Sequence, residues 1–190
     1  TSPVALGNFD IAGLPDGSYT IHMHAHDLAG NQNEATTTFT IDRTVPKVSN
    51  ISIVPRINNN IGGIVTVEFD LEDATGIDLT KTRVLFADGP NTSNAARESA
   101  KFTPVLVSGN TYKVEINTRD FVKDNWTGAY SLTFNLWDTL GNQGSSKPAA
   151  FRPILIDNSG PIYVSSNINT GDFLGKSDSK VFTVDFDDHT

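Results

Sequence analysis

Three histidines alternate in the stretch IHMHAHD, at positions 22, 24 and 26. Alternate residues of a strand point to the same side, and imidazole nitrogens bind zinc at about 2.0 Å. Neighbours in such a row lie about 6.6 Å apart along the strand, and the outer two lie about 13 Å apart. Two of them can therefore chelate one ion, whereas all three cannot easily do so. We expect His22, His24 and His26 to be solvated or packed on neighbours rather than to form a metal centre.

Carboxylates offer a different chemistry. The chain has 22 Asp and Glu residues against 14 Lys and Arg residues, a formal net charge of -8 and a pI of about 4.8. Calcium binds six to eight oxygens, chiefly from carboxylates, amide carbonyls and the backbone. The candidate oxygen ligands are Asp42, Glu72, Asp73, Asp78, Asp138 and Asn142. They are spread along the chain, so a site depends on the elements that carry them.

Composition and motifs argue against several classes of protein. An acidic chain repels phosphate backbones, so we expect no nucleic-acid partner. No stretch of about 18 apolar residues is present, so we expect no membrane insertion in this segment. The chain has no cysteine, which excludes a disulfide framework and thiolate metal sites. It contains neither G-x-S-x-G nor H-E-x-x-H, and we do not expect an enzyme.

The elements that would carry these residues have the pattern of β-strands. Apolar and polar residues alternate in YTIHMHA, IVTVEFDLED, TYKVEIN and YSLTFNLWD, and Gly, Asn, Asp and Pro separate these segments. Period-two alternation between regular turn signals is typical of an all-β sandwich.

Internal repeats divide the chain. GSYTIHMHAHDLAGNQ (17–32) aligns with GAYSLTFNLWDTLGNQ (128–143), FTIDRTVPKVSN (39–50) with ILIDNSGPIYVSS (154–166), and VTVEFDLED (65–73) with FTVDFDDHT (182–190). The period is close to the size of one immunoglobulin-type sandwich, about 100 residues. We therefore expect residues 1–45 to end one copy, 46–158 to form a complete copy, and 159–190 to begin a third.

The complete copy can be divided into seven strands. The expected strands, A to G, are 47–54, 64–71, 82–87, 101–107, 111–117, 129–137 and 150–157, with a polar loop at 88–100. Tyr19 and Tyr130, each at the start of strand F of its copy, occupy the place of the tyrosine corner in such sandwiches.

The end of each copy resembles a bacterial immunoglobulin-like (Big-type) repeat of extracellular surface proteins. Such repeats end in a D-x-x-G-N hairpin, a strand and an I-D-x-T-x-P linker. The first copy has Asp27, Gly30 and Asn31, followed by IDRTVP at 41–46, and the second has DTLGN at 138–142 and IDNSGP at 156–161. The second linker departs from the pattern with Ser-Gly before its proline. The resemblance implies tandem immunoglobulin-like domains, one complete and two partial.

This topology would gather the oxygen ligands. In an immunoglobulin-type sandwich, strands B and F run toward the pole where the domain begins, so the B–C and F–G loops lie beside the linker from the preceding domain. The linker supplies Asp42, the B–C loop supplies Glu72, Asp73 and Asp78, and the F–G loop supplies Asp138 and Asn142. We expect calcium at this junction, and the alternative is a solvated acidic pole without an ion.

The second junction repeats this set in part. Its candidate ligands are Asp157, Asp185, Asp187, Asp188 and His189.

The resemblance implies a structural role. We expect a spacer segment of an extracellular or cell-surface multidomain protein, an adhesin-type stalk whose immediate partners are neighbouring domains of the same longer chain. One alternative is an accessory module of a secreted hydrolase, a protease or a glycan-active enzyme. Another is a domain that binds a surface glycan or protein through residues 88–100 and Trp126.

Overall fold

The described chain is built almost entirely of strands. A computed structural model of the 190-residue protein describes residues 7–89, 101–120, 127–167, 171, 175 and 181–187. The strands are β1 (Gly17–His26), β2 (Gln32–Ile41), β3 (Lys47–Val54), β4 (Asn60–Ile61), β5 (Ile64–Glu72), β6 (Arg83–Ala87), β7 (Lys101–Phe102), β8 (Val105–Ser108), β9 (Thr111–Asn117), β10 (Thr127–Trp137), β11 (Gln143–Ser146), β12 (Ile154–Asp157), β13 (Ile162–Ser166) and β14 (Val184–Asp187). Two short 3-10 turns, Thr118–Asp120 and Ala149–Phe151, are the helices of these residues, and neither has the length or apolar character to span a membrane.

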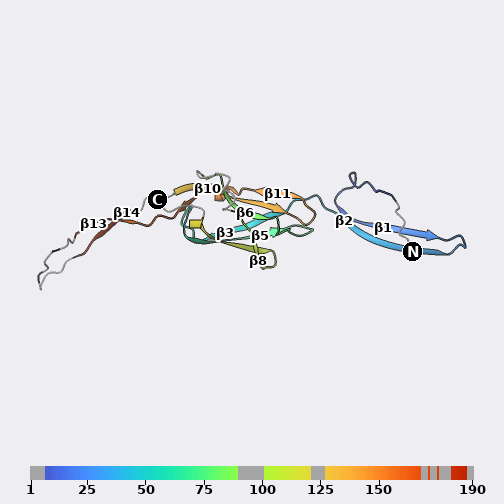
Figure 1. Ribbon diagram of the computed structural model, residues 1–190, viewed down its shortest axis with the longest axis horizontal. Coiled ribbons are helices and arrows are strands. Elements are labelled where there is room, and N and C mark those ends of the chain that lie inside the picture. Colours follow the sequence, from blue (N-terminus) through green and yellow to red (C-terminus); the bar gives the residue numbers. More distant parts are fainter. Residues whose placement is uncertain are drawn as a thin grey trace.

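Two sheets form the central β-sandwich (Figure 1). One has the antiparallel order β3-β5-β9-β8. The other has the order β4-β12-β10-β6-β7, with β11 also pairing with β10, and its pairs are antiparallel except for the parallel pair of β12 and β4.

The core lies between these sheets because alternate residues of each strand point inward. On β5 the buried residues are Val65, Val67, Phe69 and Leu71, and on β10 they include Leu132, Phe134 and Leu136. The rings of Phe69 and Phe134 meet edge to face across the two sheets, with centroids 4.9 Å apart. The expected all-β fold is confirmed.

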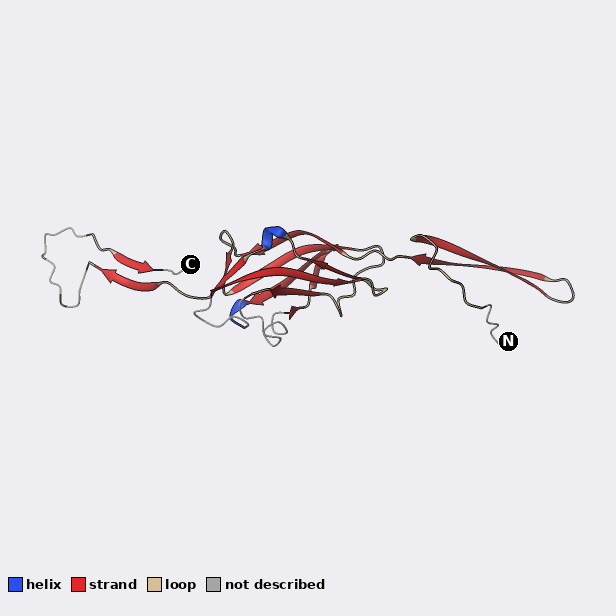
Figure 2. Ribbon diagram, turned by 90° about the horizontal axis from the view of Figure 1, so that it is seen from above, coloured by secondary structure: helices blue, strands red, loops and turns tan. Residues whose placement is uncertain are grey.

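A two-stranded hairpin lies at each end of the long axis, with the central sandwich between them (Figure 2). β1 pairs with β2 from Gly17↔Ile41 to His26↔Gln32, and β13 pairs with β14. Both hairpins are antiparallel, and each presents one apolar face that no second sheet of the described residues covers.

Most of the expected strands of the complete copy appear within two residues of their predicted bounds. Two expectations are wrong. The predicted strand 101–107 is divided into β7 and β8, which belong to different sheets, and Pro104 lies between them. The predicted strand 150–157 begins only at 154, and a 3-10 turn replaces its first part. Prolines interrupt both segments because they have no N–H to donate to a ladder.

The register of the β13–β14 pair also differs from the sequence alignment. Lys47 lies opposite Glu72 in the β3–β5 pair, and Ile162 lies opposite Asp187 in the β13–β14 pair. By this register, Asp187 corresponds to Glu72. Matching 65–73 with 182–190 pairs Asp187 with Asp70 instead, which is two residues earlier on β5. A shift of two residues leaves every side chain on the same face, so the hydrophobic pattern fits both alignments.

Candidate metal centre

Three aspartates from three different segments meet at one end of the central sandwich. Asp42 lies in the linker after β2, Asp73 directly after β5, and Asp138 directly after β10. One carboxylate oxygen from each lies within 4.8 Å of the others. Two oxygens on opposite sides of one calcium ion are separated by about 5 Å, so this set can share a single ion.

Local turns fix the orientation of two of these carboxylates. Asp42 Oδ1 accepts hydrogen bonds from the Thr44 amide at 2.9 Å and from the Thr44 hydroxyl at 2.6 Å. Asp73 Oδ1 accepts the same pair of bonds from Thr75, at 2.9 and 2.8 Å. In each D-x-T turn, one oxygen is thus held by the residue two positions later, and the second oxygen is left to face outward from the turn.

The second oxygens have no such donors. Asp42 Oδ2 and Asp73 Oδ2 are buried and accept no hydrogen bond from the described residues. Buried carboxylate oxygens are costly unless they are hydrogen-bonded, ion-paired or bound to a metal. Because both belong to the three-aspartate cluster, a cation placed among these oxygens would satisfy them together.

The third carboxylate belongs to the β10–β11 turn. Asp138 is fully buried, and its two oxygens accept hydrogen bonds from the Asn142 amide at 2.7 Å and from Asn142 Nδ2 at 2.6 Å. The same Asn142 Nδ2 donates to the backbone oxygen of Asp42 at 3.0 Å. Asn142 therefore directs its nitrogen, a donor, toward the cluster and ties the turn to the linker.

Charge defines what this cluster can hold. Hydrogen bonds from the Thr44 hydroxyl and amide hold the pKa of Asp42 below its ordinary value, which favours the ionised carboxylate. Three carboxylates this close repel one another unless a cation lies among them. An all-oxygen set of several carboxylates suits calcium, whereas magnesium is usually held by one or two carboxylates and retains several waters.

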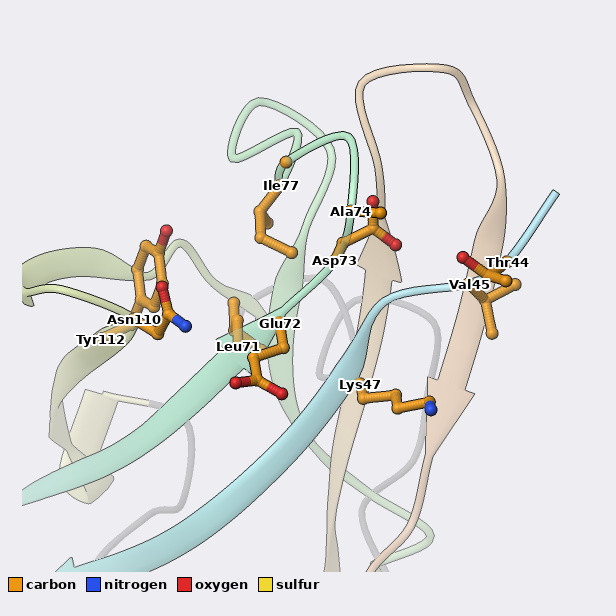
Figure 3. Close-up of a pocket in the computed structure, with 11 residues that line it drawn as sticks. Thr44, Val45, Lys47, Leu71, Glu72, Asp73, Ala74, Ile77, Asn110 and Tyr112 are labelled. Atoms are coloured by element: carbon orange, nitrogen blue, oxygen red, sulfur yellow. The ribbon is translucent and has the colours of Figure 1, made fainter. Parts of the chain in front are cut away.

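Two of the proposed ligands lie outside the cluster. Figure 3 shows the Glu72 and Asp73 carboxyl groups pointing apart, as adjacent strand residues do. Asp78 Oδ1 accepts a hydrogen bond from the Thr80 amide at 2.9 Å, and Asp78 Oδ2 pairs with Lys81 Nζ at 3.2 Å. Asp78 is thus engaged in its own turn and ion pair, and among the described residues the cluster consists of Asp42, Asp73 and Asp138.

A groove lies beside the cluster, between the linker and the loop after β5 (Figure 3). Its volume is about 480 Å³, and its lining includes Lys47, Glu72, Asp73, Asn110 and Tyr112. The lining combines both signs of charge with the apolar residues Val45, Leu71, Ala74 and Ile77, so it is more polar than the mostly apolar pockets that bind small molecules.

The second junction is described only in part. Asp157 Oδ1 accepts a hydrogen bond from the Ser159 amide at 2.8 Å, and Asp185 Oδ2 accepts one from the Ser165 hydroxyl at 2.6 Å. Asp188, His189 and Trp126, together with most of the 88–100 loop, lie outside the described residues. Within the described part of the chain, Asp157, Asp185 and Asp187 do not form a group of three metal ligands.

The three histidines are exposed on one face of β1. His24 Nδ1 lies 3.0 Å from Glu34 Oε1 on β2, while His22 and His26 lie opposite Thr36 and Gln32. No metal-binding group among the described residues includes a histidine.

Sequence reasoning missed the residues that position the cluster. The D-x-T spacing occurs at Asp42–Thr44, Asp73–Thr75 and Asp78–Thr80. This spacing is a sequence signal for a turn in which the threonine binds the aspartate two positions earlier. Gly144 was also missed. A Cβ atom at this position would lie 3.1 Å from Val45 Cβ, so glycine lets β11 approach the linker closely.

Comparison with known proteins identifies no family for this chain. No protein-family model matches the chain, and no significant match to a curated protein is found.

Proposed function

We propose that this chain is a non-catalytic spacer segment of a bacterial cell-surface or secreted multidomain protein. In this proposal, its tandem immunoglobulin-like modules are joined by short linkers, and calcium stiffens the junction at Asp42. The observation that carries the proposal is the cluster of Asp42, Asp73 and Asp138, because one of these residues belongs to the linker and two belong to the following sandwich.

Strand order supports the immunoglobulin-like part of the proposal. The order β3-β5-β9-β8 corresponds to A-B-E-D, and β12-β10-β6 corresponds to G-F-C. The strand groupings A-B-E-D and G-F-C are those of a constant-type immunoglobulin sandwich, although β4, β7 and β11 extend the second sheet here. Tyr19 adds a local feature, because its hydroxyl donates to the backbone oxygen of Pro15 at 2.7 Å, as a tyrosine corner requires.

The hairpin turns support the tandem arrangement. Asp27 accepts hydrogen bonds from the Asn31 amide at 2.8 Å and from Asn31 Nδ2 at 2.7 Å, which matches the bonds from Asn142 to Asp138. Gly30 and Gly141 both have positive φ, at 86° and 95°. The same turn thus follows β1 and β10.

The β13–β14 hairpin supports the tandem arrangement through a different contact. Asn50 Nδ2 donates to Asp70 Oδ2 at 2.7 Å between β3 and β5, and the Ser165 hydroxyl donates to Asp185 Oδ2 at 2.6 Å between β13 and β14. Both strand pairs have an irregular register near this contact. The β13–β14 hairpin therefore reproduces details of the β3–β5 pair as well as its alternation.

The function of a cation here would be mechanical. An ion that binds oxygens of both the linker and the sandwich restricts the hinge between them. Because such an ion binds the ordered junction and not the unfolded chain, it also stabilises the fold by mass action. Proline at position 46, which is buried, limits the linker further because its ring fixes φ.

Thermal melts of Asp73→Asn test the proposal. Calcium should raise the melting temperature of the wild type, chelator should reverse this, and Asp73→Asn should lose most of the calcium response. Asp78→Asn is the matched control, because Asp78 also forms a D-x-T turn but lies outside the cluster. Without an ion the carboxylates only repel, and Asp73→Asn would be neutral or stabilising. A wild-type melt unchanged by calcium would contradict the proposed junction.

A further inference from the structure

We propose that the central sandwich bears tension along the chain, and that a buried clasp of Asn158, Thr118 and Gly63 holds its last strand against that tension. This inference rests on the proposed stalk function, because load must reach the sandwich through both linkers. It concerns the pole opposite the three-aspartate cluster and residues that take no part in that cluster.

The two linkers attach to the sandwich at opposite poles. β3 begins at the pole of the three-aspartate cluster, where Lys47 lies opposite Glu72 at the end of β5. β12 ends at Asp157, which lies opposite Thr127 at the start of β10. The hairpins beyond these linkers lie at opposite ends of the long axis (Figure 2). Tension between the linkers therefore acts along the strands and not across the sheets.

The last strand of the sandwich is paired so that tension shears it. β12 pairs in parallel with β4, with Leu155 opposite Asn60 and Ile156 opposite Ile61. The Leu155 amide also donates to the Asn59 oxygen at 2.9 Å. Tension pulls β4 from its N-terminal end, through β3, and pulls β12 from its C-terminal end. Parallel neighbours pulled in this way slide past each other, so their hydrogen bonds must break together and cannot be peeled apart one at a time.

The buried clasp fastens the chain directly after β12. Asn158 Oδ1 accepts hydrogen bonds from the Thr118 hydroxyl at 2.6 Å and from the Gly63 amide at 3.1 Å. The Thr118 amide donates to the Gly63 oxygen at 2.8 Å, which joins these two residues to each other. Thr118 and Asn158 are 0% and 5% exposed, so water competes little for these bonds. Because Gly63 and Thr118 adjoin β5 and β9, the clasp ties the exit of one sheet to the other sheet.

A glycine beside the clasp allows the close approach that it needs. A Cβ atom at Gly62 would lie 2.0 Å from the Asp157 oxygen, so any larger residue at this position would force the two segments apart. Asp157 and Asn158 therefore lie directly against the connection between β4 and β5. This contact brings the Gly63 amide within reach of Asn158 Oδ1.

The first copy anchors its linker at the equivalent residue. Arg43 follows the Ile-Asp pair of the first linker as Asn158 follows that of the second. Arg43 binds Asp16, in the segment before β1, and Asn158 binds Thr118, in the segment before β10. The residue after each linker aspartate thus fastens the chain to the domain that the chain is leaving. The Arg43 pair is half exposed and the Asn158 clasp is buried, so we expect the clasp to be the stronger anchor.

Single-molecule stretching of the full chain by its two ends tests the clasp. The chain has no cysteine, so one cysteine added at each end gives unique attachment points. Unfolding of residues 46–158 is recognised by a contour gain of roughly 350 Å, because an extended residue spans about 3.4 Å. The wild-type sandwich should remain folded at forces that have already extended both hairpins.

Thr118→Val removes the clasp hydroxyl, and Thr82→Val is the matched control. Thr82 is also fully buried, and its hydroxyl accepts a hydrogen bond from the Trp137 amide at 3.0 Å, between β6 and β10, which neither linker joins. Both variants lose one buried hydroxyl and should unfold faster in urea. At constant force, Thr118→Val should accelerate unfolding about tenfold more than it does in urea, whereas the two effects of Thr82→Val should agree within about twofold.

Asn158→Ala removes the shared acceptor and should reproduce the acceleration that Thr118→Val causes at force. The double variant should unfold no faster than the faster single variant, because both changes act on one clasp. The same ratio of force effect to urea effect in Thr118→Val and Thr82→Val would overturn the inference. Additive effects in the double variant, or a wild-type sandwich that opens at the force of the hairpins, would also overturn it.

The clasp and the calcium junction fail separately. The effect of Thr118→Val at force should be the same in calcium and in chelator, because the clasp and the cluster lie at opposite poles. A wild-type melt that does not respond to calcium would contradict the junction and leave the clasp intact. A normal calcium response without the selective effect of Thr118→Val at force would contradict the clasp alone.

Discussion

Arg43 Nη1 lies 2.8 Å from Asp16 Oδ1 at the base of the first hairpin, while the residue before it, Asp42, is bound by Asn142 of the central sandwich. Arg43 also donates to the backbone oxygens of Leu14 and Ile11, at 2.9 Å each. Of these two consecutive linker residues, Asp42 is therefore bound to the central sandwich and Arg43 to the segment that precedes β1. Motion at this junction has to break one set of contacts or the other.

Removing the Arg43 side chain should release the hairpin side of the linker. Arg43→Ala should increase amide hydrogen exchange around residues 11–16 several-fold and leave the central strands unchanged. The cost in stability should be small, about 1 kcal/mol or less, because the ion pair is half exposed. Arg43→Lys keeps the charge but loses the forked geometry, and should restore little of the protection. Unchanged exchange at 11–16 in Arg43→Ala would show that the contacts do not hold the linker.

Thr75→Val should weaken calcium binding roughly tenfold, because the Asp73 carboxylate would lose the hydroxyl that orients it. Thr80→Val removes the equivalent hydroxyl at Asp78, outside the cluster, and should leave calcium affinity unchanged. Isothermal titration calorimetry of both variants makes the comparison. Equal effects in the two would mean that turn geometry, not the cluster, governs binding.

Asp70 should make the stability of the central sandwich depend on pH. Hydrogen bonds from the side chains of Asn50 and Thr111 hold the pKa of Asp70 below its ordinary value of 3.8. The contribution of the ionised carboxylate is therefore complete above about pH 4 and is lost as the pH falls through the lowered folded value. Thr111→Val should be destabilising at neutral pH, and its difference from the wild type should shrink in acid.

Urea unfolding between neutral and acidic pH measures this difference. Thr66→Val, on the same face of β5 as Asp70, is the control and should show no such convergence with the wild type. A Thr111→Val effect that is constant with pH would rule out the linkage to Asp70.

Phe69 should be essential to the core. Its ring is fully buried and meets Phe134 between the sheets, so Phe69→Ala should lower the free energy of unfolding by about 3–5 kcal/mol. Val54→Ala, at an exposed position of β3, should change it by less than about 0.5 kcal/mol. Chemical denaturation of both variants gives the comparison, and a small effect at Phe69 would mean that the sheets are not packed through this pair.

The histidine row should not be a zinc site. Calorimetric titration with zinc should show no site tighter than weak micromolar affinity that depends on His22, His24 or His26. His24→Ala should give the same zinc titration as the wild type. The outward face of β1 offers only pairs of neighbouring histidines, and His24 already lies against Glu34. A stoichiometric site that disappears in His24→Ala would contradict this.

Local pattern was sufficient to predict most strands. The alternation in 64–72 and 111–117 defines both the strand and its buried face, because side-chain period is a property of the strand itself. The same reasoning failed at 101–107 and 150–157, each of which contains a proline that interrupts the strand. Which sheet each fragment joins is decided by partners that are distant in sequence.

By itself, the sequence determined the all-β class, the internal repeat and the residue types available at the junction. Only the tertiary structure decided that Asp42, Asp73 and Asp138 meet, while Asp78 turns to Lys81 and Glu72 points away. It also decided that Asn142 directs its nitrogen to the cluster, and that the register of β13 and β14 is shifted by two residues from the sequence alignment. The physical reason is that period-two patterns are unchanged by a shift of two, and that carboxylates from separate loops converge only when two sheets pack.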